Sequence, residues 1–149
     1  MALHAQQQII DWFGATLLAG STDAAANVFT DRLDPLTGEQ IPAIDIEGGD
    51  ETVEPYTIEN MQLRDFNVLV KCTVAQVSGY EEAARALGLQ VEKLVAAPPA
   101  RAGGLCLGGV SITSNQLAKA GEGDTAVAAV VQTWSCKYIV RAHEPDTPL

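Results

Sequence analysis

The stretch Leu63–Val77 reads LRDFNVLVKCTVAQV, and its pattern decides the fold class. Apolar and polar side chains alternate along it, so an extended strand would have one apolar face and one largely polar face. The apolar face holds Phe66, Val68, Val70, Cys72 and Val74, whereas the other holds Asn67, Lys71 and Thr73. Ser78 and Gly79 end the pattern. The stretch therefore predicts a long strand that buries one face.

Helical patterns lie on both sides of this strand. From Leu3 to Ala19 apolar residues recur at steps of three and four, and Gly20 ends the repeat. From Tyr80 to Ala96 the same period returns, and Pro98-Pro99 prevents its continuation. Both segments have one apolar stripe, so each predicts a helix that packs on a sheet.

Further extended segments complete the expected sheet. Residues 27–30 predict a short strand, and residues 41–47 predict a second strand that Gly48-Gly49-Asp50 ends. Residues 105–117 predict a strand weakened or bulged at Gly108-Gly109. Residues 125–141 predict a long final strand with one apolar face, formed by Trp134, Cys136, Tyr138 and Val140. The order predicts an α+β fold: a mostly antiparallel sheet, an N-terminal and a central helix packed on it, and a long C-terminal β-hairpin.

Length and composition indicate one globular domain. The chain has 149 residues, of which 47% are hydrophobic and only 19% charged, and this composition excludes a disordered chain. A chain of this length can bury a core without a disulfide or a metal. We expect a single domain over residues 1–143 and a flexible C-terminal tail over residues 144–149, which contains Pro145 and Pro148.

The negative charge is concentrated in one part of the chain. The formal net charge is −10, which disfavours a surface for nucleic acid or anionic membranes. Between Asp31 and Asp65 ten acids face only Arg32 and Arg64, a net charge of −8, and the rest of the chain carries −2. Any account of the acidity must therefore explain this segment.

The ends of the chain and its cysteines give no sign of export or thiol chemistry. No lysine or arginine precedes Ile9, Asp11 interrupts the apolar stretch, and no apolar run approaches the roughly 18 residues of a membrane span. We expect a soluble cytoplasmic protein whose three cysteines are reduced and buried. The only histidines, His4 and His143, lie near the two ends, so a Cys–His nucleophile pair is not supported.

One group of acids could coordinate a hard cation. It consists of Asp45, Glu47, Asp50, Glu51 and Glu54. Asp45 and Glu47 lie two residues apart on the predicted strand, so both carboxylates would point to one face, and Asp50 and Glu51 follow on a glycine-rich turn. The spacing is not that of an EF-hand, and a solvated or interface surface is the expected role. We predict no catalytic residue, no cofactor and no metal.

Three stretches resemble a known family. They are VFTDRLDPL at residues 28–36, IPAIDI at residues 41–46 and GDE at residues 49–51. The last predicted strand also ends in a matching motif, YIVR at Tyr138–Arg141. Together with the order of elements, they resemble the tail terminator, or tail completion (minor tail), proteins of long-tailed bacteriophages. The resemblance in element order covers essentially the whole chain, although residues 103–109 depart from it.

The resemblance implies a virion structural protein without catalytic activity. Such a protein forms a ring, typically a hexamer, that caps the tail tube, ends its polymerisation and provides the surface that joins the tail to the head. The implied partners are copies of the same chain, the tail tube protein and a neck or connector protein. Phage DNA passes through the lumen without specific binding, and no membrane is involved. The implied location is the head-proximal end of the virion tail, after assembly in the host cytoplasm.

We hypothesise that part of the acidic segment lines the lumen of the ring or faces a neighbouring ring. In the lumen it would repel passing DNA, and at a ring interface it would select a complementary surface. A head–tail joining or stopper ring of the neck is the first alternative. A small cation-dependent enzyme that uses the acidic group is a distant one.

Overall fold

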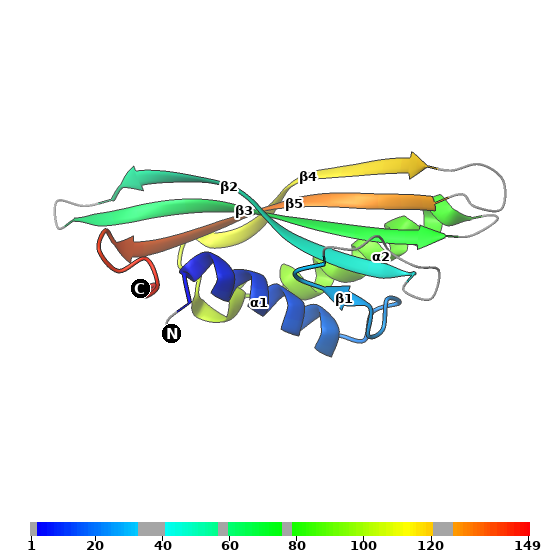
Figure 1. The fold of residues 1–149 in the computed structure, drawn as a ribbon, viewed down its shortest axis with the longest axis horizontal. Helices are drawn as coiled ribbons and strands as arrows, with labels where there is room; N and C mark the ends of the chain where they lie inside the picture. The colour runs from blue at the N-terminus through cyan, green and yellow to red at the C-terminus, as the bar shows by residue number, and fades with distance from the viewer. Residues whose placement is uncertain (1–2, 33–40, 57–59, 76–78, 121–126) are drawn as a thin grey trace.

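The computed structural model describes residues 3–32, 41–56, 60–75, 79–120 and 127–149, and within them two α-helices lie against a five-stranded sheet (Figure 1). The helices are α1 (Ala5–Ala19) and α2 (Tyr80–Val95), and a short 3₁₀ turn, η2, spans Ala102–Gly104. The strands are β1 (Val28–Phe29), β2 (Ala43–Pro55), β3 (Met61–Ala75), β4 (Gly109–Ala120) and β5 (Val127–Arg141).

The strands follow the order β1-β2-β3-β5-β4. β1 pairs with β2 in parallel, and the other neighbours are antiparallel. Both helices lie on the same face of the sheet, which is elongated and twisted (Figure 1). The predicted α+β class is therefore confirmed, including both helices and the antiparallel C-terminal strands. The connection at residues 121–126 lies outside the described residues.

The core lies between this face and the two helices. On β3 and β5 the predicted apolar faces are confirmed, because all of their members are buried. Those members are Phe66, Val68, Val70, Cys72, Val74, Trp134, Cys136, Tyr138 and Val140. The helices contribute Ile9, Phe13 and Leu17 from α1 and Leu87, Val91 and Val95 from α2. Full burial of one large apolar side chain contributes roughly 1.5–3 kcal/mol, so this layer supplies most of the driving force for folding.

The three cysteines are free and buried, as predicted. Burial raises the pKa of the Cys72 thiol to about 12. Its reactive thiolate form is therefore scarce at neutral pH.

A polar side chain lies at the centre of this apolar layer. Gln132 on β5 is fully buried, and its amide nitrogen donates to the carbonyl oxygen of Gly88 on α2 at 2.9 Å. Its amide oxygen accepts a hydrogen bond from the indole nitrogen of Trp134 at 3.1 Å. A Cβ atom at position 88 would lie 3.1 Å from the Gln132 nitrogen, so glycine permits the close approach of α2 to the sheet. Gln132 therefore fixes where α2 lies along β5.

The predicted end of the second strand at Gly48-Gly49-Asp50 is wrong. β2 continues through these residues to Pro55, and its register with β3 shifts between Gly48 and Glu51. The glycines mark a β-bulge, where an extra residue is inserted without ending the ladder. Asp50 and Glu51 consequently lie in the strand and not on a turn.

The predicted start of the next strand, at Leu105, is also wrong. Residues 105–108 form a turn, in which the Cys106 amide donates to the Arg101 carbonyl, and β4 begins at Gly109 and runs to Ala120. Gly109, the first residue of β4, has a φ of +94°, a conformation that favours glycine, and the chain turns into the strand at this residue. The bulge in this strand lies between Ile112 and Ser114.

The last residues return to the body of the protein. The carbonyl of Pro145 accepts from the Ala5 amide at 3.1 Å, and the Leu149 amide donates to the Ile139 carbonyl at 2.9 Å. The domain limits and the flexibility expected for residues 144–149 stay predictions. Within the described residues, neither helix is long and apolar enough to cross a membrane.

The Gln132 contacts lead to a first prediction. Gln132→Leu removes the donor to Gly88 and leaves the buried Trp134 nitrogen without an acceptor, so the free energy of unfolding should fall by about 2 kcal/mol. Urea denaturation measures this change. Gln116→Leu, on the exposed part of β4, is the matched control and should shift stability by less than about 0.5 kcal/mol. Equal stability of the two variants would contradict the role of Gln132.

Candidate interaction site

The five acids of the predicted site all lie on β2, but the bulge divides them between the two faces of the sheet. Before the bulge, Ile44 and Ile46 point into the core, so Asp45 and Glu47 project from the opposite face. After it, Glu51 lies opposite Phe66, on the face that the helices share, and Glu54 lies opposite Leu63. The acids therefore do not form one cluster.

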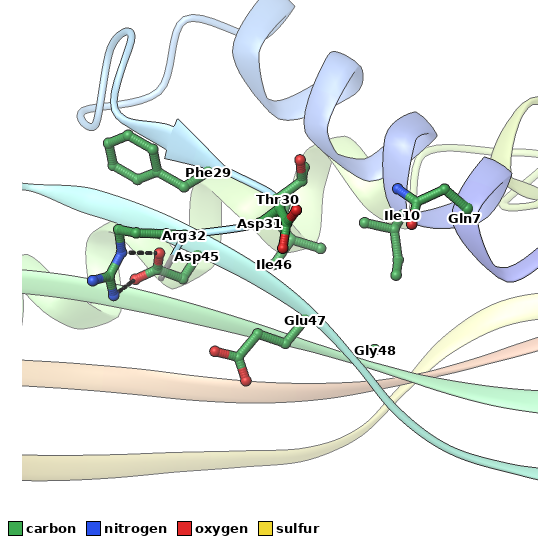
Figure 2. Close-up of a pocket in the computed structure, with 10 residues that line it drawn as sticks. All are labelled: Gln7, Ile10, Phe29, Thr30, Asp31, Arg32, Asp45, Ile46, Glu47 and Gly48. Carbon is green, nitrogen blue, oxygen red and sulfur yellow. Dashed lines mark hydrogen bonds and ion pairs between the residues drawn. The ribbon is translucent and has the colours of Figure 1, made fainter. Parts of the chain in front are cut away.

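Asp45 is paired with an arginine that follows β1. The Arg32 guanidinium donates from Nε to Asp45 Oδ1 at 2.7 Å and from Nη2 to Oδ2 at 2.9 Å (Figure 2). The Asp45 side chain is only 5% exposed. This two-point geometry is the strongest form of a carboxylate–guanidinium contact, so the pair neutralises Asp45 and joins β2 to the chain after β1.

Glu51 belongs to a second, largely buried network. Its Oε2 lies 3.3 Å from Arg64 Nη1 on β3, and its Oε1 accepts a hydrogen bond from the Tyr138 hydroxyl on β5. Arg64 also donates to Gln62 Oε1 from Nη2, at 2.9 Å. Burial raises the pKa of Tyr138, and the hydrogen bond to Glu51 raises it further, so the hydroxyl keeps its proton and donates it. The network ties β2, β3 and β5 together beyond the bulge.

The other three acids remain on the surface. Glu47, Asp50 and Glu54 are exposed, and none of them has an ion-pair partner among the described residues. We call these three residues the exposed acidic set. They are spread along one strand from residue 47 to residue 54, so they present negative charge along a line.

A surface cleft of about 350 Å³ lies beside the first half of β2. Figure 2 shows Gln7 and Ile10 of α1 at one end, the Arg32–Asp45 pair at the other and Glu47 on β2 between them. Arg32 and Asp45 already neutralise each other, so they offer no free acid–base pair for catalysis. The cleft is suited to hydrogen bonding with a partner surface.

The cation-site alternative gains no support from the part of the chain that the structure describes. No group of three or more histidine, cysteine, aspartate or glutamate side chains there could hold a metal ion. Asp45 and Glu51 each have an arginine partner, and they lie on opposite faces of the sheet.

Arg32 and Arg64 were not identified as site residues from the sequence, where they counted only as minor opposing charge. Strand pairing offers a signal for Arg64, because antiparallel pairing of β2 with β3 brings Glu51 and Arg64 to diagonal positions on adjacent strands. No local pattern indicates the Arg32–Asp45 contact, because it depends on the parallel pairing of β1 with β2.

Loss of the cation in the second network should destabilise the fold. Arg64→Met leaves the Glu51 charge, whose side chain is 10% exposed, with only the Tyr138 hydroxyl as partner. We expect a loss of about 2 kcal/mol in the free energy of unfolding, below the ~3–5 kcal/mol typical of fully buried pairs. Urea denaturation measures it, with Glu54→Gln, an exposed residue of β2, as the control. An unchanged midpoint for Arg64→Met would show that the network does not stabilise the protein.

Comparisons with known proteins add little to this geometry. No family model matches the sequence, and no curated protein matches it. Among solved structures, the chain is similar to one from the "Virion of native gene transfer agent (GTA) particle", with 18% identity and a TM-score of 0.43. The alignment covers 91% of this chain and 95% of that chain. A likeness at this TM-score carries no conclusion about function.

Proposed function

We propose that this protein is a structural component of a phage-like virion. In this proposal it forms a ring of identical copies, a hexamer, that caps the tail tube, ends its polymerisation and provides the surface that joins the tail to the head. Its partners are the tube protein on one side and a neck or connector protein on the other.

The pairing of β1 with β2 is the observation that carries the proposal. The two stretches with the clearest family resemblance, residues 28–36 and 41–46, lie side by side, because Val28 and Phe29 pair with Ile44 and Asp45. Arg32 of the first stretch holds Asp45 of the second. Residues 33–36 lie outside the described residues. Within the rest, the stretches that resemble the family form one structural unit.

The surface chemistry of β2 supports assembly over catalysis. The exposed acidic set, Glu47, Asp50 and Glu54, lies on an open strand, and its charge is repeated in every copy of a ring. There it lines the lumen, where it repels DNA phosphates, or faces a neighbouring ring, where it selects a complementary surface. Like charges on adjacent copies repel, so apolar contacts have to offset them. Val53 and Tyr56, 47% and 52% exposed, are apolar side chains available on or next to β2.

The proposal is tested with purified protein and purified tube protein. Native mass spectrometry should detect a ring of one size, and negative-stain images should show the ring at one end of each tube. Addition of the ring before polymerisation should shorten the tubes, because capped ends cannot grow. A monomer, or tubes of unchanged length without bound rings, would overturn the proposal. A ring that binds a connector protein but not the tube would instead identify a neck stopper.

Neutralisation of the exposed acidic set tests its role within this function. Glu47→Gln, Asp50→Asn and Glu54→Gln together should change capping and reduce its dependence on salt, because Coulomb interactions of exposed charges are screened by ions. Capping is measured as tube length over a salt series. The control combines Asp11→Asn, Asp23→Asn and Glu82→Gln, three exposed acids away from β2, which removes the same charge. Capping by the β2 variant that equals wild type at every salt concentration would rule the role out.

A further inference from the structure

The sheet has two open edges. β4 is the last strand on one side, and no described strand pairs with it opposite β5. On the other side, β1 covers β2 only at Ile44 and Asp45, so β2 has no described partner there from Ile46 to Pro55. Residues 47–50 and 52–55 are exposed. Open edges carry unpaired backbone donors and acceptors that can pair with another chain.

The backbone of β2 beyond the bulge points hydrogen-bonding groups away from the sheet. The Ile44 amide donates to the Asn27 carbonyl, on the side away from β3, and Ile44 lies opposite Cys72. Val53 lies opposite Arg64, an even number of residues from Cys72 along β3. Opposite residues in an antiparallel ladder alternate between hydrogen-bonded and non-hydrogen-bonded pairs, so two pairs an even number of residues apart are of the same kind. The Val53 amide therefore also points outward.

The β4 edge also has backbone amides that point away from the sheet. The Val110 amide donates to the Ala100 carbonyl at 2.8 Å, away from β5, and Val110 lies opposite Cys136. Asn115 lies opposite Gln132, again an even number of residues away along β5. The Asn115 amide therefore points outward, and its side chain is exposed.

The two edges differ in charge. β2 contains five acids and no base, whereas β4 contains Lys119 and no acid. Pairing of β2 with β2 of another copy would bring two acidic strands together, which is unfavourable. Pairing of β2 with β4 avoids this repulsion, because β4 contains no acid and its Lys119 is paired with Glu81 of α2 in the same copy.

We propose that the β4 edge of one copy pairs with the open part of β2 of the next copy. The proposal rests on the ring proposed above and names the contact that builds it. Within one sheet β2 and β4 run in opposite directions, since each of the three intervening pairings is antiparallel. Copies in the same orientation therefore meet as antiparallel strands. A contact between two different edges leaves one free edge at each end of the row, so it repeats from copy to copy and forms a ring when the rotation between copies closes.

Proline substitution tests each edge separately. Val53→Pro and Asn115→Pro each remove one outward amide and place a ring in the path of the partner strand, while a strand edge tolerates proline within its own sheet. Val53→Ala and Asn115→Ala are the controls, because they keep the amide. Circular dichroism and thermal melting report whether each variant is folded, and light scattering after size exclusion reports its mass.

The expected result is complementation. Each proline variant alone should be a monomer, and each alanine control should assemble like wild type. An equimolar mixture of the two proline variants should form a 1:1 dimer and nothing larger, because only one intact β2 edge and one intact β4 edge remain to pair. A Val53→Pro variant that dimerises on its own would show β4–β4 pairing and overturn the proposal.

Hydrogen exchange of the wild type gives a second measurement that needs no variant. The amides of Val53 and Asn115 should exchange slowly at concentrations where the ring forms and quickly in dilute monomer. Equal exchange rates in the ring and in the monomer, or proline variants that assemble fully, would overturn edge pairing. Neither result would contradict the tube-capping proposal. Rings that pair through these edges yet leave tubes uncapped would overturn only the capping function, and a wild type that remains monomeric would overturn both.

Discussion

The structure depends on the pairing of β3 with a strand on each side, with β5 along its whole length and with β2 from Gln62 to Thr73. Its partners are β2 and β5, and every second residue from Phe66 to Val74 is buried against the helices. Because side chains alternate strictly along a strand, this one register places the apolar faces of β2 and β5 on the same side. The α1 and α2 helices then cover that side, and Gln132 fixes the position of α2.

The β2 bulge converts this regular sheet into a surface with a particular charge distribution. Without the shift between Gly48 and Glu51, the acids after it would face the opposite way. The shift brings Glu51 to Arg64 and Tyr138 and leaves Glu54 exposed. Of the five acids on β2, two are thus neutralised by arginines, and three have no ion-pair partner among the described residues.

Periodicity predicted much of the fold because it is a local property. The faces of β3 and β5 and the extents of α1 and α2 followed from spacing alone. The errors occurred at glycines: Gly48-Gly49 lies within a strand, and Gly109 begins one. A glycine permits a turn, a bulge or a strand start, and the neighbouring strand decides among them. The arginine partners of Asp45 and Glu51 could not be predicted for the same reason. Each lies thirteen residues away, Arg32 in the segment after β1 and Arg64 on β3.

The sequence by itself determined the α+β class, the burial of the alternating faces and the concentration of acid between Asp31 and Asp65. These features depend on residue type and spacing, which are present in the chain before it folds. Only the tertiary structure decided which carboxylates are neutralised, where α2 lies on the sheet and which strands form its edges. Those features depend on register between distant segments, and register is settled when the strands pair and the core closes.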